Sequence, residues 1–197
     1  MQTAIRQSFS TTFDGFTSSI PGKVVLGLGA TLVVAAAAHV SIPLWFTPVP
    51  MTLQPLAVLG VGLALGPIAG FLTMLAYLAE GALGLPVFSP VVGLGGVAQI
   101  VGPTGGYLMA YPLVAFIVGA ITRGLQGKLP RFAAAAIACT AAVVLLYACG
   151  AGWLKFERHL SMQAAWMAGI VPFLPGEAIK IVAASGLYST FARARRS

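Results

Sequence analysis

The sequence predicts an all-α integral membrane protein with six transmembrane helices. Hydrophobic residues make up 58% of the 197 positions and charged residues 8%, whereas soluble domains carry about 25% charged residues. Six spans of about 20 residues need roughly 120 positions, which this length supplies together with loops but without a separate soluble domain. The eleven Lys and Arg residues stand between apolar blocks rather than on one polar face, which argues against nucleic acid as a partner. This composition excludes a soluble enzyme.

The first 84 residues contain three predicted spans. Residues 1–23 are polar and are expected to form a cytoplasmic tail before the first span, over 24–42. Three prolines within 43–50 end that helix, because proline lacks an N–H donor and clashes with the preceding turn. The second and third spans are expected over 52–65 and 68–84. The alanine-rich first span is also compatible with a cleavable signal sequence.

The segment 85–105 differs from the spans around it. Its apolar content is interrupted repeatedly by Pro and Gly, so a regular helix is not expected there. Irregular backbone at membrane depth must be buried in protein or line a wet cavity, because lipid cannot satisfy free N–H and C=O groups. The segment is therefore the predicted binding loop.

Three further spans are expected over 106–121, 132–150 and 174–191, with a mixed interfacial segment between the last two. The single six-helix domain then covers 24–192, and 193–197 form a basic C-terminal tail. Placing both termini in the cytoplasm puts eight of the eleven Lys and Arg residues inside and two outside. The positive-inside rule therefore predicts cytoplasmic N- and C-termini.

Three ionisable residues fall inside predicted spans, namely Glu80, Glu177 and Lys180. A charged side chain at the bilayer centre costs about 2.5 to 3.5 kcal/mol on insertion scales, so these residues are functional candidates. Glu177 and Lys180 are three residues apart, so they share one helix face and can form an ion pair. Two alternatives stay open: the pair is purely structural, and Glu80 snorkels from the end of its span.

Several polar residues are expected at the same depth in the membrane. Under the predicted topology, Glu80 and Glu177 lie near the outer ends of their spans, Gln54 begins the second span, and 99–107 precede the fourth. Their convergence predicts a pocket on the extracytoplasmic side, capped by the outer loops. Aromatic neighbours such as Trp45 suit this pocket to a small amphipathic solute.

Motifs for catalysis are missing from the sequence. It has no GxxxxGK[ST] phosphate loop, so the chain is not expected to power ATP-driven uptake by itself. It has no GxSxG or HExxH motif and no Cys/His cluster. We therefore expect no enzyme activity, no metal and no cofactor.

Four short motifs carry a resemblance to a known family. HVSIP at 39–43, PVPMTLQ at 48–54, GLPVF at 84–88 and GPTGGY at 102–107 resemble the BioY family, the biotin-specific S components of energy-coupling factor (ECF) transporters. The resemblance implies a six-helix fold of the bacterial cytoplasmic membrane whose outer loops cap one biotin. It also implies partners, namely a transmembrane coupling protein and two ABC-type ATPase subunits that drive delivery.

The resemblance also implies site residues. In the family an acidic residue and a lysine three positions later in the last helix contact the vitamin, and Glu177 and Lys180 match them. As a hypothesis, Glu177 accepts hydrogen bonds from the ureido N–H groups and Lys180 donates to an acceptor on biotin. The candidate binding residues are Glu177, Lys180, Tyr107, Gln54, Phe88, Gln99, Glu80 and Trp45.

Small residues on the first span form a stripe of Gly27, Thr31 and Ala35, which lets another helix approach closely. We expect this stripe to dock on the coupling protein. Packing within the chain is an equal alternative, and the neighbouring stripe of Ala30, Val34 and Ala38 is not excluded.

Two rival functions stay open. One is a self-sufficient transporter of biotin or another small solute, and the other is a lipid-directed membrane enzyme using Glu80, Glu177 and His159.

Overall fold

The computed structural model describes residues 19–194 and is almost entirely helical. Residues 1–18 and 195–197, most of the two predicted tails, lie outside this description. The elements in chain order are α2 (Ile20–His39), β1 (Ser41–Ile42), β2 (Met51–Thr52), α3 (Gln54–Leu65), α4 (Pro67–Ala82), η1 (Pro90–Val92), α5 (Val97–Val101), α6 (Gly105–Leu125), α7 (Arg131–Glu157), α8 (Met162–Gly169), η2 (Val171–Phe173) and α9 (Leu174–Ala194). The predicted all-α class is confirmed.

Four stretches of the described chain are long and apolar enough to cross a membrane: Ile20–His39, Gly105–Leu125, Arg131–Glu157 and Met162–Phe191. The helices α3 and α4 are apolar but have only 12 and 16 residues. At about 1.5 Å per residue they are shorter than the roughly 30 Å hydrocarbon core of a bilayer. The structure therefore shows a multi-helix membrane protein with four span candidates of full length.

Element boundaries depart from the sequence expectation at several places. Helix α7 continues to Glu157 rather than ending at 150. Helix α2 begins at Ile20 rather than at 24, because the Ser19 hydroxyl accepts a hydrogen bond from Gly22 N at 3.2 Å and Pro21 suits the first turn. In the segment expected to lack regular helix, residues Val97–Val101 form the five-residue helix α5. The remainder of 85–104 is irregular apart from the three-residue 3₁₀ turn η1, as the Pro and Gly content predicted.

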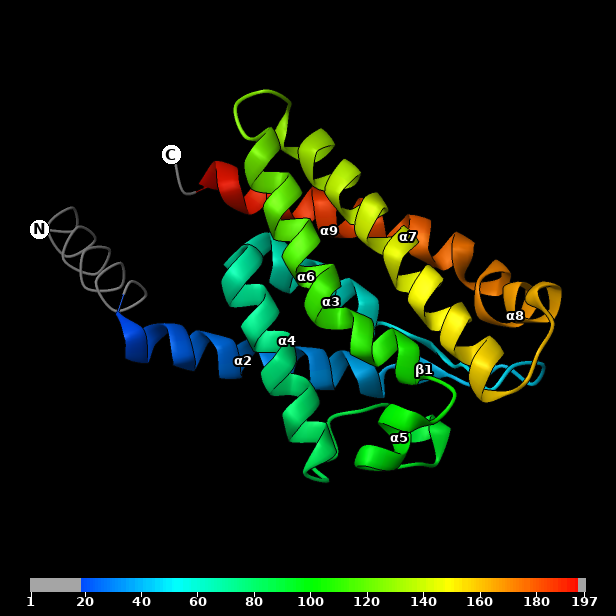
Figure 1. Cartoon of the computed structure of the whole chain (residues 1–197). Coiled ribbons are helices and arrows are strands. Elements are labelled where there is room, and N and C mark those ends of the chain that lie inside the picture. The colour runs from blue at the N-terminus through cyan, green and yellow to red at the C-terminus, as the bar shows by residue number, and fades with distance from the viewer. Residues whose placement is uncertain (1–18, 195–197) are drawn as a thin grey trace, which may run out of the picture.

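Helix α6 lies at the centre of the bundle, alongside α7 and in contact with α3 and α4 (Figure 1). Glycines bring these helices together. A Cβ at Gly62 would lie 2.6 Å from the Ala115 carbonyl oxygen, and a Cβ at Gly119 would overlap the backbone of Gly66 and Pro67. The packing therefore depends on direct backbone contact, as is common between membrane helices.

A short hairpin follows α2, which the sequence analysis did not anticipate. Strands β1 and β2 pair antiparallel, with Ser41 opposite Thr52 and Ile42 opposite Met51. The loop between them is held by Thr47, whose hydroxyl donates to the Ala168 carbonyl on α8 at 2.8 Å. This loop, the segment 83–104 and the connection from α7 to α9 meet at one end of the bundle, where the candidate site lies.

The small-residue stripe of α2 packs inside the chain. Thr31 is 1% exposed and donates a hydrogen bond to Glu80 Oε1 at 3.0 Å, and a Cβ at Gly27 would lie 3.2 Å from Thr73 Oγ1 on α4. Ala35 is half-buried beside this contact. The Thr31 side chain is turned toward α4, which favours the alternative of packing within the chain, and docking of the stripe on a coupling protein stays a prediction.

Candidate functional site

The candidate site is a cavity of about 50 Å³ at the loop-rich end of the bundle. Five parts of the chain contribute to it: the β1–β2 loop with the start of α3, the segment 83–104, α6, α7, and the η2–α9 junction. The lining residues are Val49, Pro50, Thr52, Gln54, Pro55, Ser89, Val92, Gln99, Thr104, Tyr107, Leu108, Tyr111, Leu146, Tyr147, Phe173, Glu177 and Lys180.

Glu177 and Lys180 form a buried ion pair at the cavity wall. Lys180 Nζ lies 2.6 Å from Glu177 Oε1, and the two side chains are 8% and 3% exposed. Glu177 stands in the first turn of α9, where the helix dipole favours a negative charge. Its second oxygen, Oε2, is buried and has no hydrogen-bond partner. One acceptor of the pair is therefore left for a ligand.

Two hydroxyl groups at the cavity are also buried without partners. They belong to Ser89, just before η1, and Thr104, which immediately precedes α6. Threonine at that position normally caps the helix by accepting a backbone N–H, but the Thr104 side chain makes no such bond. Unpartnered buried polar atoms are rare, and three of them, counting Glu177 Oε2, surround this one cavity. Their position indicates a polar ligand.

Ser89 and Thr104 were not predicted from the sequence as site residues. Ser and Thr are common in loops, so their residue type carries little signal. The available clue was their place within the segment already predicted as the binding loop, and for Thr104 its place within GPTGGY.

The two predicted glutamines line the cavity and anchor its walls. Gln54 Nε2 donates to the Tyr77 hydroxyl at 2.7 Å, and that hydroxyl donates to the Val87 carbonyl at 2.7 Å. Gln99 Nε2 donates to the Ser89 carbonyl at 3.0 Å. Both amides therefore use a donor to hold the segment 83–104 in place.

Tyr107 belongs to an aromatic wall of the cavity. Its ring lies edge-on to Tyr147 at 6.0 Å between centroids, and Tyr147 stacks on Phe173 at 6.3 Å. The Tyr107 hydroxyl donates to the Gly169 carbonyl at 2.6 Å, so it ties α6 to the end of α8. A Cβ at Gly150 would overlap the Tyr107 ring, which is why this position needs glycine. The wall offers flat apolar surface to a small ring.

Three candidate residues lie outside the cavity lining. Phe88 packs edge-on against Tyr77, with 5.4 Å between the two ring centroids. Trp45 is 96% exposed on the hairpin loop. Glu80 accepts the hydrogen bond of Thr31. The structure therefore does not bring these three residues to the cavity lining, and their contacts with a ligand stay predictions.

The assembled groups suit reversible binding. The cavity offers an unpartnered carboxylate oxygen, an ammonium group and two hydroxyls, next to aromatic and aliphatic side chains. A neutral head group with both donors and acceptors, joined to an apolar ring, matches that chemistry.

Comparisons with known proteins give one consistent result. The BioY family model matches residues 8–197. The biotin transporter BioY of Rhodobacter capsulatus is 37% identical over 182 residues, which cover 88% of this chain and 94% of that protein. A protein of Pyrococcus horikoshii named probable biotin transporter BioY is 39% identical over 137 residues, covering 70% of this chain and 76% of that protein.

A solved structure shares the fold. It is a crystal structure of the S-component for biotin from an ECF-type ABC transporter, with a TM-score of 0.79 and 26% sequence identity. The match covers 87% of this chain and 90% of that chain.

Proposed function

Because this chain belongs to the BioY family, we propose that it captures biotin as the substrate-binding S component of an ECF-type transporter. The family is one of transporters rather than enzymes. The observation that carries the proposal is the cavity that joins the buried Glu177–Lys180 pair to unpartnered oxygens, on a fold that matches a biotin S-component.

The cavity chemistry fits the ureido head of biotin, which has two N–H donors and one carbonyl acceptor. Glu177 Oε2 accepts from a ureido N–H, and a charge-assisted bond of this kind is strong in a dry site. Lys180 and the hydroxyls of Ser89 and Thr104 donate to the ureido oxygen. The apolar sulfur ring then lies against the aromatic wall that contains Tyr147.

The proposed topology places six helices across the bacterial cytoplasmic membrane, with the shorter α3 and α4 completing the bundle. Both termini are cytoplasmic and the cavity lies on the extracytoplasmic side, in agreement with the eight-to-two distribution of Lys and Arg. Biotin then enters from outside and leaves toward the cytoplasm.

Delivery requires partners in this proposal. The sequence holds no phosphate loop, so ATP hydrolysis is supplied by two ABC-type ATPases through a transmembrane coupling protein. The alternative is biotin transport by this chain without the ATPase module. Biotin uptake into proteoliposomes distinguishes these two alternatives. Accumulation of biotin without the ATPase module supports autonomous transport, whereas a strict requirement for the module and ATP supports the S-component function.

The direct test is calorimetric titration of the purified chain in detergent with biotin, using riboflavin and thiamine as controls. One-to-one binding of biotin alone is the expected result. Glu177→Gln and Lys180→Ala should each weaken binding at least tenfold, because each removes one partner of a charge-assisted bond. Absence of biotin binding by the unsubstituted chain would disprove the proposed function.

A further inference from the structure

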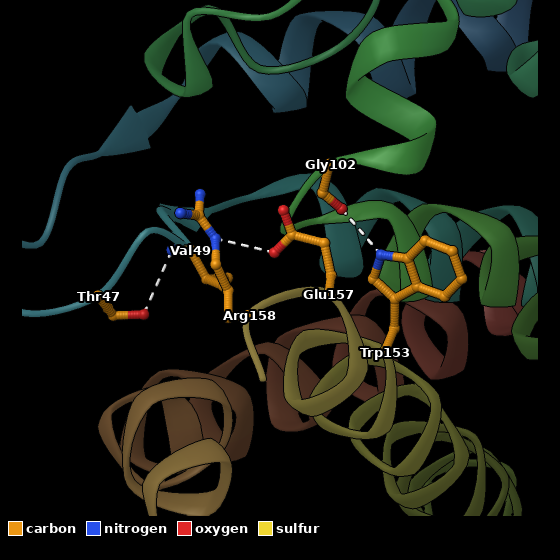
Figure 2. A network of polar contacts seen from close by, with 6 residues as sticks. All are labelled: Thr47, Val49, Gly102, Trp153, Glu157 and Arg158. Atoms are coloured by element: carbon orange, nitrogen blue, oxygen red, sulfur yellow. Dashed lines mark hydrogen bonds and ion pairs between the residues drawn. The ribbon is translucent and has the colours of Figure 1, made fainter. Parts of the chain in front are cut away.

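A tryptophan on α7 contacts the loop that carries Thr104. Trp153 Nε1 donates a hydrogen bond to the Gly102 carbonyl at 2.9 Å, and Figure 2 shows the indole reaching from α7 toward that carbonyl. The side chain is half-buried and lies outside the cavity lining. Its ring is beside that of Phe156, with 6.2 Å between the two centroids. Trp153 therefore faces the loop rather than the ligand.

The carbonyl that Trp153 binds belongs to a tight turn. Gly105 N also donates to the Gly102 carbonyl, at 2.9 Å, which closes a turn of four residues. Pro103 occupies the second position, where proline is favoured, and Thr104 the third, with φ of −91° and ψ of 0°. These are the features of a type I turn. The Gly102 carbonyl thus accepts two hydrogen bonds, one within the turn and one from α7.

The glycines that follow Thr104 make room for the tryptophan. A Cβ at Gly105 would overlap the Ile100 carbonyl and lie 3.0 Å from Trp153 Nε1. A Cβ at Gly106 would overlap the Trp153 Cβ and lie 2.5 Å from the Cys149 carbonyl oxygen. A side chain at either position would push the turn away from its neighbours. The close fit against Trp153 therefore explains the glycine pair of the GPTGGY motif.

Thr104 is held on both sides while its hydroxyl stays without a partner. Its carbonyl accepts from the backbone N–H groups of Tyr107 and Leu108 at 3.1 and 3.2 Å, at the start of α6. The hydroxyl is buried at the cavity and makes no hydrogen bond to the part of the chain that the structure describes. A group that is fixed in advance loses little further freedom when it binds a ligand, which improves affinity.

One of the contacts that fix the turn is long-range. The bonds from Gly105 N and at the start of α6 join near neighbours, whereas the bond from Trp153 reaches a helix 51 residues further along the chain. The position of the turn relative to α7 therefore depends on Trp153. Resting on the proposed function, we infer that Trp153 is a positioning residue for biotin, which holds the turn where the Thr104 hydroxyl donates to the ureido oxygen.

The test is a double-mutant cycle of biotin affinity, measured by calorimetry in detergent. Trp153→Phe removes the donor and keeps an aromatic ring, and it should weaken biotin binding about fivefold, as expected for one hydrogen bond. The variant should fold, because the Gly102 carbonyl keeps its bond from Gly105 N. In the Thr104→Val background the same substitution should change the affinity by less than about twofold, because the hydroxyl that Trp153 positions is already absent.

Trp166→Phe is the matched control, since Trp166 is an exposed tryptophan on α8, and it should leave the affinity unchanged. A tryptophan analogue with sulfur in place of the indole N–H, introduced instead of Trp153, keeps the full ring and should reproduce the effect of Trp153→Phe. A normal affinity with this analogue would overturn the role of the hydrogen bond.

Equal weakening by Trp153→Phe with and without the Thr104 hydroxyl would show a merely structural role and would overturn the inference, as would no weakening in either background. Both results leave biotin capture intact. If the unsubstituted chain does not bind biotin, the proposed function itself fails and this inference fails with it.

Discussion

Gln54 on α3 and Tyr77 on α4 are joined by a buried hydrogen bond of 2.7 Å, and the Tyr77 hydroxyl in turn donates a hydrogen bond to the Val87 carbonyl. This relay links two helices to the segment that forms one wall of the cavity. We predict that Tyr77→Phe lowers the free energy of unfolding by about 1–3 kcal/mol, because it leaves buried polar groups unpartnered. Biotin affinity should fall as the wall loosens.

Thermal unfolding in detergent, with and without biotin, measures both effects. Tyr188→Phe is the matched control, since Tyr188 accepts its hydrogen bond from Gln126 at an exposed site. An equal loss of stability in the two variants would contradict the importance of the buried relay.

The buried ion pair predicts non-additive substitutions. Lys180→Met leaves the Glu177 carboxylate buried without its cation and should cost about 3–5 kcal/mol of stability. The double variant Glu177→Gln with Lys180→Met removes both charges, so it should recover most of that stability while biotin binding stays lost. Unfolding and titration of the two single variants and the double variant check this. Additive losses of stability would show that the pair contributes no coupling.

The unpartnered hydroxyls predict opposite effects on stability and binding. Thr104→Val should weaken biotin binding severalfold and leave the ligand-free protein equally or more stable, because a buried hydroxyl without a partner is costly. Thr122→Val is the matched control, since its hydroxyl is also buried and unpartnered but does not line the cavity. It should raise stability without changing biotin affinity, and a similar loss of affinity in both variants would contradict the role of Thr104.

The contact of Gly150 with the Tyr107 ring predicts a size limit. Gly150→Ala should destabilise the protein by about 1–3 kcal/mol and weaken biotin binding, because the added methyl group would push Tyr107 and with it the aromatic wall. Gly152→Ala, two residues along the same helix, meets nothing within 4 Å and should be neutral. Circular dichroism melting and biotin titration compare the two, and equal behaviour would refute the packing argument.

The sequence predicted the features that depend on charge and hydropathy. Glu177 and Lys180 stood out because charges are costly inside an apolar helix, and the breaks between helices followed from Pro and Gly. The unpartnered hydroxyls of Ser89 and Thr104 at the cavity did not stand out, because only the folded packing shows which hydroxyl lacks a partner. The exposed position of Trp45 could not be predicted, because residue type does not give side-chain direction on a hairpin loop.

The stripe on α2 shows a different limit. Small residues at helical spacing indicate a close approach of helices but do not identify the approaching helix. Only the contact of Gly27 with Thr73, and of Thr31 with Glu80, identified α4 as the partner.

The shortness of α3 and α4 has a consequence for the surrounding lipid. In the proposed topology these helices offer about 18 and 24 Å of apolar length against roughly 30 Å of hydrocarbon. Lipids beside them must compress or let head groups sink inward, a hydrophobic mismatch that costs a fraction of a kcal/mol per Å. In that topology the thinned lipid lies beside the exposed face of α4, with Ile68, Leu72 and Leu75, and acyl-chain length becomes a variable that changes the stability of the protein.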